Sequence, residues 1–276
     1  MENTNCNPPF EWIAIDVDGT LLDSNENLSP GSAEAFQKAC ECGNRILLVT
    51  GRSQSSLEFI LNQLPVRGPF IGSGGAFIGD LLTGEVIQQY TLPRHEVEKA
   101  VQLTRQMDLV LFLDHSNFML CEKSFDFIRR AKHVNSYRWK IVPDLMQELT
   151  ILPEKGLVVG DEIKLKGLFN VYESRPSEVS ITFTSPTSMD ILPKGVGKGK
   201  ALIKLANHLQ IPLQHIAVIG DYLNDLEMFK VAGYSIAMGN APEEVKRAAD
   251  WVAPTNDEGG VSSAIYHLLS LNGKEK

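Results

Sequence analysis

The sequence lacks the features that mark zinc-binding, secreted and membrane-spanning proteins. Its four cysteines do not have the paired spacing of a zinc site. No run of about 18 apolar residues occurs, and residues 1–9 have no basic region followed by an apolar one, so we expect neither a transmembrane helix nor a signal peptide. The sequence therefore predicts a cytoplasmic protein.

Basic residues are also scarce relative to acidic ones. The chain has 26 Lys and Arg residues against 34 Asp and Glu residues, for a net charge of −8. Such a protein is a poor match for nucleic acid or for an anionic membrane surface, although a local positive pocket can still bind a phosphate group. We expect a small-molecule partner, no nucleic acid and no membrane, and we leave open whether the protein is a monomer or a homodimer.

What the sequence does contain is an alternation of short apolar runs and amphipathic segments at both ends of the chain. With 276 residues, 43% of them hydrophobic, the chain can bury a large core and is long enough for two domains. The spacing predicts strands over 12–15, 45–49, 69–71, 216–219 and 234–237, and helices over 31–42, 53–64, 199–209, 224–231 and 242–249. In a parallel sheet, the simplest arrangement puts the strand at Ile216 beside the strand at Ile13.

The middle of the chain has a different pattern, which follows a predicted hairpin over 76–90. It predicts helices over 94–107 and 124–134 and paired strands over 109–113, 118–121, 163–171 and 179–183. Prolines and a glycine interrupt residues 134–161, which receive no assignment. We therefore predict an α/β fold: a Rossmann-like parallel-sheet core made of residues 1–82 and 192–276, interrupted by an α+β module over 83–191.

Two aspartates follow the first predicted strand directly. The stretch reads W-I-A-I-D-V-D-G-T, so Asp16 and Asp18 lie where the strand ends, and Gly19 follows them. In open α/β sheets the ligand crevice lies beyond the carboxyl ends of the strands. Two such close carboxylates favour a cation between them, and a hard ion such as Mg2+ takes oxygen ligands. A simple Asp-Gly turn is the alternative on these residues alone.

A second strand end carries acidic residues in the same way. Residues 216–219 are followed by Gly220, Asp221 and, four residues later, Asp225. These carboxylates would project into the same crevice and complete an oxygen-rich pocket suited to Mg2+. Asn224 or Asp225 could instead cap the following helix, a role that is compatible with a place in the site.

Two other stretches can supply groups for a phosphate. Thr50 ends a predicted strand, so its hydroxyl and the amide of Gly51 could hold a phosphoryl oxygen, with Arg52 a further candidate. Lys198 lies between glycines, which allow a close backbone approach. The stretch around Lys198 is not a P-loop, because its glycine spacing and the residue after its last lysine do not fit that motif.

Taken together, these motifs resemble the four motifs of the haloacid dehalogenase superfamily of phosphohydrolases. They occur in the family's order, as D-x-D-G-T-L-L from Asp16, T-G-R from Thr50, K-G from Lys198 and G-D-x-x-N-D from Gly220. The long insertion between the second and third motifs, together with M-G-N-A over 238–241 and N-D-E-G-G-V over 256–261, is similar to the Cof-type branch with its large α+β cap of the C2B type.

The resemblance implies a covalent mechanism. Asp16 would attack phosphorus to form an aspartyl-phosphate, and Asp18 would protonate the leaving oxygen and then activate water. Mg2+ would be held by the Asp16 carboxylate, the Asp18 carbonyl and Asp221, with Asp225 supporting the site. The phosphoryl group would be bound by Thr50 and Lys198, with Asn224 as a further phosphate contact.

The sequence departs from the Cof-type pattern at two positions. Tyr222 stands where the pattern has Gly or Ser, and Gly74 stands where it has Asn. The first departure puts a bulky ring near the metal loop, and the second removes a side-chain amide that commonly lines the substrate pocket in the family. Neither changes the proposed nucleophile, so we expect them to affect specificity. We expect a phosphatase acting on a small phosphorylated metabolite, with a sugar phosphate favoured. The alternatives are a phosphomutase and a catalytically silent phosphate-binding module.

Overall fold

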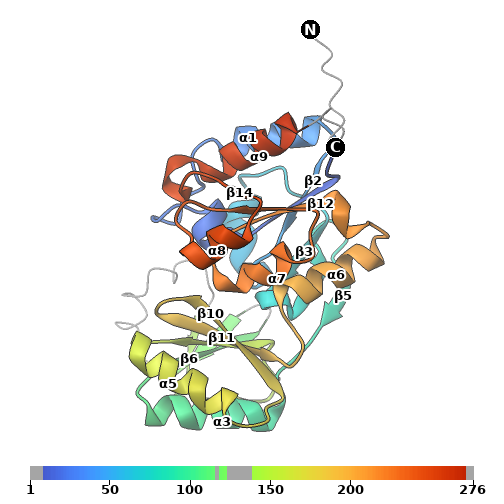
Figure 1. Cartoon of the computed structure of the whole chain (residues 1–276). Helices are drawn as coiled ribbons and strands as arrows, with labels where there is room; N and C mark the ends of the chain where they lie inside the picture. The colour runs from blue at the N-terminus through green and yellow to red at the C-terminus, as the bar shows by residue number, and fades with distance from the viewer. Residues whose placement is uncertain (1–8, 116–117, 123–138, 272–276) are drawn as a thin grey trace.

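The computed structural model describes residues 9–115, 118–122 and 139–271. Figure 1 shows a larger body that contains both ends of the described chain and a smaller body built from its middle. No helix among the described residues is long and apolar enough to cross a membrane. The arrangement is the predicted one, a parallel-sheet core and a separate cap with a mixed sheet.

The core sheet has five parallel strands in the order β14-β13-β12-β1-β2. Ile13 lies opposite Ala217, which confirms that the first strand and the strand at Ile216 are neighbours. The strands are β1 (Trp12–Ile15), β2 (Arg45–Leu48), β12 (Ile216–Gly220), β13 (Tyr234–Ala237) and β14 (Trp251–Val252).

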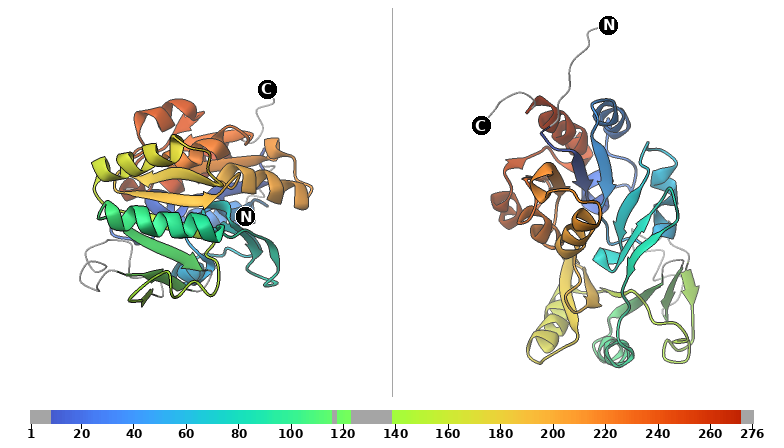
Figure 2. Two further views of the ribbon diagram at one scale, coloured as in Figure 1. Left: turned by 90° about the horizontal axis from the view of Figure 1, so that it is seen from below. Right: turned by 90° about the vertical axis from the view of Figure 1, so that its right-hand side faces the viewer.

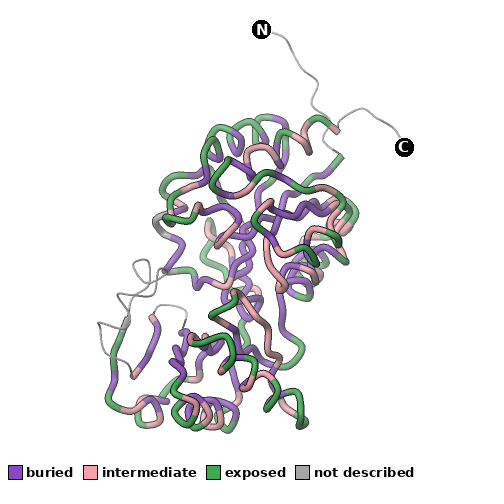
Figure 3. The backbone as a smooth tube through the Cα atoms, turned by 60° about the vertical axis from the view of Figure 1, so that its left-hand side comes forward, coloured by how far each residue is buried: buried purple, intermediate pink, exposed green. Residues whose placement is uncertain are grey.

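Both faces of the core sheet are covered by helices. Ile13 and Ile15 pack on the side of α1 (Ser32–Glu41) and α9 (Gly260–Ser270), whereas Ala14 packs on the side of α6 (Lys198–His208). The short α7 (Leu226–Phe229) and α8 (Glu243–Ala248) contribute to the second side. A strand buried on both faces is apolar throughout, which explains why β1 reads as a continuous apolar run. Figure 3 shows the buried chain at the centre of this body.

A three-stranded antiparallel sheet extends the core beyond β2. It consists of β3 (Pro69–Gly72), β4 (Phe77–Asp80) and β5 (Val86–Gln89), and an isolated parallel bridge joins Val49 to Ile71. The expected domain boundary at residue 82 falls in the turn between β4 and β5. The division into 1–82, 83–191 and 192–276 therefore stays a prediction. β5 lies in the range expected for the cap, but it pairs with β4 of the core.

The cap is a six-stranded sheet with helices α3 (Arg94–Gln106) and α5 (Glu162–Glu173) packed on one face (Figures 1 and 2). The strand order is β10-β11-β9-β6-β7-β8. The strands are β6 (Val110–His115), β7 (Phe118–Cys121), β8 (Trp139–Ile141), β9 (Lys155–Val159), β10 (Val179–Ser185) and β11 (Ser188–Pro193).

One predicted strand of the cap is wrong. Residues 163–171 lie in helix α5, which buries Leu165, Leu168 and Tyr172 on one side. The alternation of Ile163 and Leu165 suggested a strand, but Ile163 is 80% exposed and the buried residues follow the helical period. Asp161 caps the helix by accepting hydrogen bonds from the amides of Ile163 at 2.9 Å and Lys164 at 3.3 Å.

Other helix predictions differ in extent. The helix predicted over 53–64 is a 3-10 turn (Gln54–Leu57) followed by the single turn α2 (Glu58–Leu61). The helix predicted over 224–231 begins with a 3-10 turn (Leu223–Asp225) and continues as α7. The helix predicted over 124–134 lies outside the described residues.

The N-cap of α5 gives a direct test of this assignment. Replacing Asp161 with Ala removes the acceptor for two helix amides and should lower the free energy of unfolding by about 1 kcal/mol, as N-cap losses do. Asp161→Ser keeps a capping oxygen and should lose less than half of that. Urea denaturation of the three proteins measures both values, and equal stability of all three would contradict the capped helix.

Candidate active site

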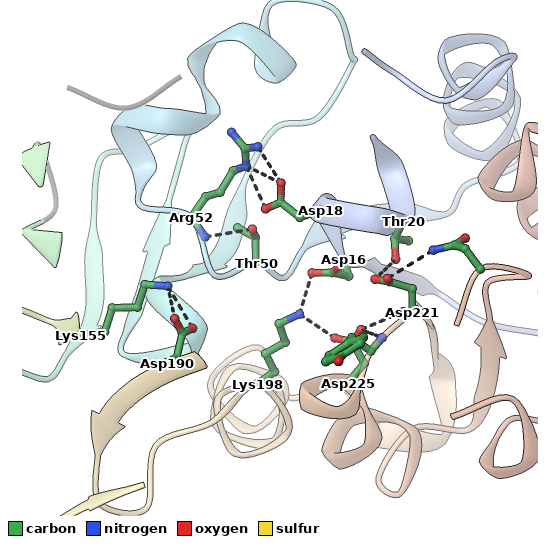
Figure 4. Close-up of polar contacts among 12 residues, drawn as sticks. Asp16, Asp18, Thr20, Thr50, Arg52, Lys155, Asp190, Lys198, Asp221 and Asp225 are labelled. Carbon is green, nitrogen blue, oxygen red and sulfur yellow. Dashed lines mark hydrogen bonds and ion pairs between the residues drawn. The ribbon is translucent and has the colours of Figure 1, made fainter. Parts of the chain in front are cut away.

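The site forms where the carboxyl ends of β1 and β12 meet. Asp16 follows β1 and Asp221 follows β12, and the two strands pair in parallel up to Ile15 and Ile219. Asp225 lies four residues further, and one carboxylate oxygen from each of the three aspartates lies within 4.8 Å of the others. Figure 4 shows these carboxylates pointing toward one another. The adjacency of the two strands therefore creates the acidic cluster.

Lys198 is the cation at the centre of this cluster. It is the first residue of α6, and its Nζ lies 2.6 Å from Asp16 Oδ1 and 2.6 Å from Asp225 Oδ1. Burial disfavours the charged ammonium, but the charges of Asp16 and Asp225 outweigh that effect and raise the pKa of Lys198. Lys198 is therefore held positive beside the carboxylate of Asp16.

Asp225 organises the loop around it. Its Oδ2 accepts hydrogen bonds from the amides of Asp221 at 2.9 Å and Tyr222 at 3.1 Å, while its Oδ1 holds Lys198. A Cβ at Gly220 would lie 2.6 Å from the Asp225 carboxyl carbon, so this position needs a glycine. Asp225 thus supports the site through both oxygens, and Tyr222 contributes to it with its backbone amide.

Two further residues orient Asp221, and neither received a role from the sequence. Thr20 donates a hydrogen bond from Oγ1 to Asp221 Oδ1 at 3.0 Å. The Asn240 amide donates to the Gly19 carbonyl at 2.8 Å and lies 3.4 Å from Asp221 Oδ2. Gly19 has φ +78°, and a side chain there would overlap with Asp221. Both residues lie in motifs that carried the family resemblance, which was the available signal.

Asp18 is directed toward Arg52 and away from Lys198 (Figure 4). Arg52 Nε lies 3.1 Å from Asp18 Oδ1 and 3.0 Å from Oδ2, and Nη2 lies 2.6 Å from Oδ1. The Arg52 side chain is 1% exposed and that of Asp18 is 37% exposed. Arg52, expected as a phosphate contact, therefore binds Asp18 in this conformation.

The remaining predicted residues border this centre. Thr50 is buried, and its Oγ1 accepts a hydrogen bond from the Arg52 amide at 3.0 Å. A Cβ at Gly51 would lie 3.3 Å from Lys155 Nζ of the cap. Asn224 lines a cavity together with Lys198, and its buried Oδ1 has no hydrogen-bond partner among the described residues. The structure thus places the predicted residues around Lys198 and Asp16, while Asp18 and Arg52 form a separate pair beside them.

The charges of the cluster fit a divalent cation. Burial raises the pKa of Asp16 to about 7, with Asp225 and Asp18 adding to the effect and Lys198 opposing it. The pKa of Asp221 is raised as well, by burial and by the charges of Asp16 and Asp225. These buried carboxylates outnumber the one ammonium among them, and hard cations such as Mg2+ take carboxylate oxygens. The acidic cluster could therefore bind a metal ion.

Comparison with known proteins places the chain in a family. A family model described as haloacid dehalogenase-like hydrolase matches residues 13–265. The 5-amino-6-(5-phospho-D-ribitylamino)uracil phosphatase YwtE of Bacillus subtilis is 30% identical, over 95% of this chain and 99% of that protein. Phosphatase YwpJ of the same organism is 28% identical, over 94% of this chain and 100% of that protein.

Solved structures agree with this placement. The haloacid dehalogenase-like hydrolase from Bacteroides thetaiotaomicron superimposes with a TM-score of 0.82 at 28% identity, covering 94% of this chain and 99% of that one. At this coverage the match includes both the core and the cap. The chain belongs to the haloacid dehalogenase-like hydrolases, and it is a phosphomonoester hydrolase of that family.

Proposed function

We propose that the protein is a Mg2+-dependent phosphatase that hydrolyses a small phosphorylated metabolite, of the sugar phosphate class, through an aspartyl-phosphate at Asp16. The observation that carries the proposal is the buried Asp16 carboxylate, held by Lys198 at 2.6 Å and beside Asp221 and Asp225. Phosphoryl transfer depends mainly on positioning the nucleophile and neutralising the phosphoryl oxygens. This cluster can do both.

In the first step a carboxylate oxygen of Asp16 attacks phosphorus, and the bond from phosphorus to the ester oxygen breaks. Asp18 gives a proton to the departing oxygen. Lys198 and the Thr50 hydroxyl hold the phosphoryl oxygens, and Asn224 supplies a further polar contact. Asp16 and Asp221, with the Asp18 carbonyl, would hold Mg2+, which would supply charge neutralisation for the phosphoryl group.

In the second step water attacks the phosphorus of the aspartyl-phosphate, and Asp18 takes the proton of that water. Inorganic phosphate leaves and the Asp16 carboxylate is restored. The contact with Arg52 stabilises the ionised form of Asp18, which is the form that accepts this proton. The first step needs the protonated form, so we propose that Asp18 turns away from Arg52 when the substrate binds.

The nucleophile is tested by Asp16→Asn. This change removes the attacking carboxylate with little change in shape, so turnover of p-nitrophenyl phosphate with Mg2+ should fall by at least about 1,000-fold, since the covalent route is lost. Glu34→Gln removes one exposed carboxylate on α1 and should leave the rate unchanged. An Asp16→Asn protein that retains a tenth of the activity would exclude Asp16 as the nucleophile.

The metal site is tested by thermal stability at two pH values. In the metal-free protein the pKa of Asp16 rises from 3.8 to about 7 through burial, so its contribution to stability is full at low pH and is lost as the pH rises toward 7. Mg2+ binds the ionised carboxylates, so the rise in Tm on adding Mg2+ should be larger at pH 8 than at pH 5.

The matched control for the metal experiment is Asp221→Asn, in which one charged ligand becomes neutral. The rise in Tm on adding Mg2+ should then be small at both pH values. A rise that is equal at pH 5 and pH 8 in the unchanged protein, or one that survives in Asp221→Asn, would contradict a metal site built from these carboxylates.

The contact between Arg52 and Asp18 is tested by Arg52→Lys. Lysine keeps the positive charge but lacks the planar fork that contacts both oxygens of Asp18. We expect kcat for p-nitrophenyl phosphate to fall about 10- to 100-fold, because Asp18 loses the contact that holds its ionised form for the second step, a size of effect usual for one general acid–base group. Unchanged kcat in a stably folded Arg52→Lys protein would show that Asp18 needs no such support.

A further inference from the structure

The cap is hydrogen-bonded to the core at the turn that follows β3. We call this turn, Ser73–Gly75, the Ser73 turn. Glu154 directly precedes β9 of the cap, and its side chain accepts hydrogen bonds from Ser73 Oγ at 2.5 Å and from Gln89 Nε2 of β5 at 2.8 Å. Its backbone amide donates to the Asp114 carbonyl of β6 at 2.8 Å. Glu154 is 2% exposed and therefore joins the cap sheet to the core from a buried position.

The Ser73 turn is bonded on its other side to residues 50–52, which we call the Thr50 loop. The Ser73 amide donates to the Arg52 carbonyl at 2.9 Å, and the Gly74 amide donates to the Thr50 carbonyl at 3.0 Å. The Thr50 hydroxyl is the proposed contact for a phosphoryl oxygen, and the Arg52 side chain binds Asp18. The Ser73 turn therefore lies between the cap and the loop that would bind the phosphate.

Ser73 has a backbone conformation that residues with a side chain rarely adopt, with φ +49°. Such conformations persist where the surrounding contacts over-determine them. Ser73 is fully buried, its amide is bound to Arg52, and its hydroxyl is bound to Glu154. The contact with Glu154 thus helps to hold the Ser73 turn in the shape that bonds to the Thr50 loop.

A second cap contact packs against the same two segments of the core. Lys155 Nζ binds the two carboxylate oxygens of Asp190 at 2.9 and 3.0 Å, and both side chains are buried. A Cβ at Gly51 would lie 3.3 Å from Lys155 Nζ, and a Cβ at Gly74 would lie 3.3 Å from Asp190 Oδ2. The ion pair therefore approaches the Thr50 loop and the Ser73 turn closely, at positions where the sequence has glycine.

We propose that Glu154 is a positioning residue for phosphate binding, which holds the Thr50 loop in its binding conformation through the Ser73 turn. This rests on the proposed phosphatase function and deepens it. The path consists of the hydrogen bond from Ser73 to Glu154 and the two backbone hydrogen bonds from the Ser73 turn to the Thr50 loop. The placement of the cap is thereby linked to the affinity for the phosphate group itself, in addition to any contact of the cap with the leaving group.

The experiment measures the Ki of inorganic phosphate as a competitive inhibitor of p-nitrophenyl phosphate hydrolysis with Mg2+ present. Inorganic phosphate has no leaving group, so its Ki reports phosphate binding without a cap contact to the rest of an ester. Ser73→Ala removes the donor of the contact and Glu154→Ala removes its acceptor. Each change should raise the Ki about fivefold, the usual effect of one hydrogen bond.

Two further variants test whether the effect passes through this contact. In the double variant Ser73→Ala with Glu154→Ala the Ki should stay about fivefold raised, because residues that act as a unit do not have additive effects. Glu154→Gln keeps an acceptor oxygen for Ser73, and the Gln89 amide can turn so that its oxygen accepts from the new amide. The Ki of Glu154→Gln should therefore lie within about twofold of that of the unchanged protein, since the hydrogen bond is kept.

Gln89→Ala is the matched control. Gln89 bonds the other carboxylate oxygen of Glu154, but it lies at the end of β5, outside the Ser73 turn and the Thr50 loop. Gln89→Ala should leave the Ki of phosphate unchanged, whereas a general loosening of the cap would raise it. The Tm of every variant should stay above the assay temperature, which separates loss of positioning from loss of folding.

The outcomes separate the two proposals. If the unchanged protein does not hydrolyse p-nitrophenyl phosphate with Mg2+, the proposed phosphatase function fails, and the positioning role fails with it. If it does hydrolyse this ester, the positioning role alone is overturned by an unchanged Ki in Ser73→Ala or in Glu154→Ala. A Ki raised as much by Gln89→Ala as by Ser73→Ala, or two single effects that multiply in the double variant, would overturn it as well.

Discussion

The site depends on one buried cation, the Lys198 ammonium, which contacts the carboxylates of Asp16 and Asp225 at 2.6 Å each. All three side chains are buried. Removing one partner from such a buried group leaves uncompensated charge and typically costs about 3–5 kcal/mol. The position of α6 relative to β1 is therefore tied to the position of the proposed nucleophile.

The parallel sheet brings the carboxylates around Lys198 together. β1 and β12 are neighbours whose carboxyl ends coincide, so Asp16 and Asp221 come together from positions about 200 residues apart in the chain. Backbone amides and side chains then fix each carboxylate: Asp225 binds the loop after β12, and Thr20 binds Asp221. These contacts fix the carboxylates of Asp16, Asp221 and Asp225 within the protein itself, and such positioning is what phosphoryl transfer requires.

The sequence predicted the core and its motifs because the signals are local. A buried strand that ends at an aspartate can be recognised from about seven consecutive residues, because a strand buried on both faces is a continuous apolar run. Asn240 is different: it binds the Gly19 carbonyl, and nothing in its neighbours indicates that partner. Such a contact depends on how distant loops meet, so it could not be derived from local spacing.

The cap was harder to predict for the same reason. Ile163 and Leu165 alternate as in a strand. The segment is a helix because it packs Leu165, Leu168 and Tyr172 against the sheet, and that packing outweighs the local pattern. The pairing of Asp114 with Lys155 and the contact of Lys155 with Asp190 likewise depend on strand order. Strand order in a mixed sheet is set by the whole cap, and the sequence periodicity does not contain it.

We propose above all that Asp16 carries the phosphoryl group during turnover. Rapid acid quenching of the enzyme during hydrolysis of p-nitrophenyl phosphate, followed by borohydride reduction, converts an acyl phosphate of aspartate to homoserine. Peptide mass spectrometry then locates the modified residue. We predict homoserine at position 16, and only with substrate present. Homoserine at another aspartate, or none in enzyme quenched during steady turnover, would contradict the account.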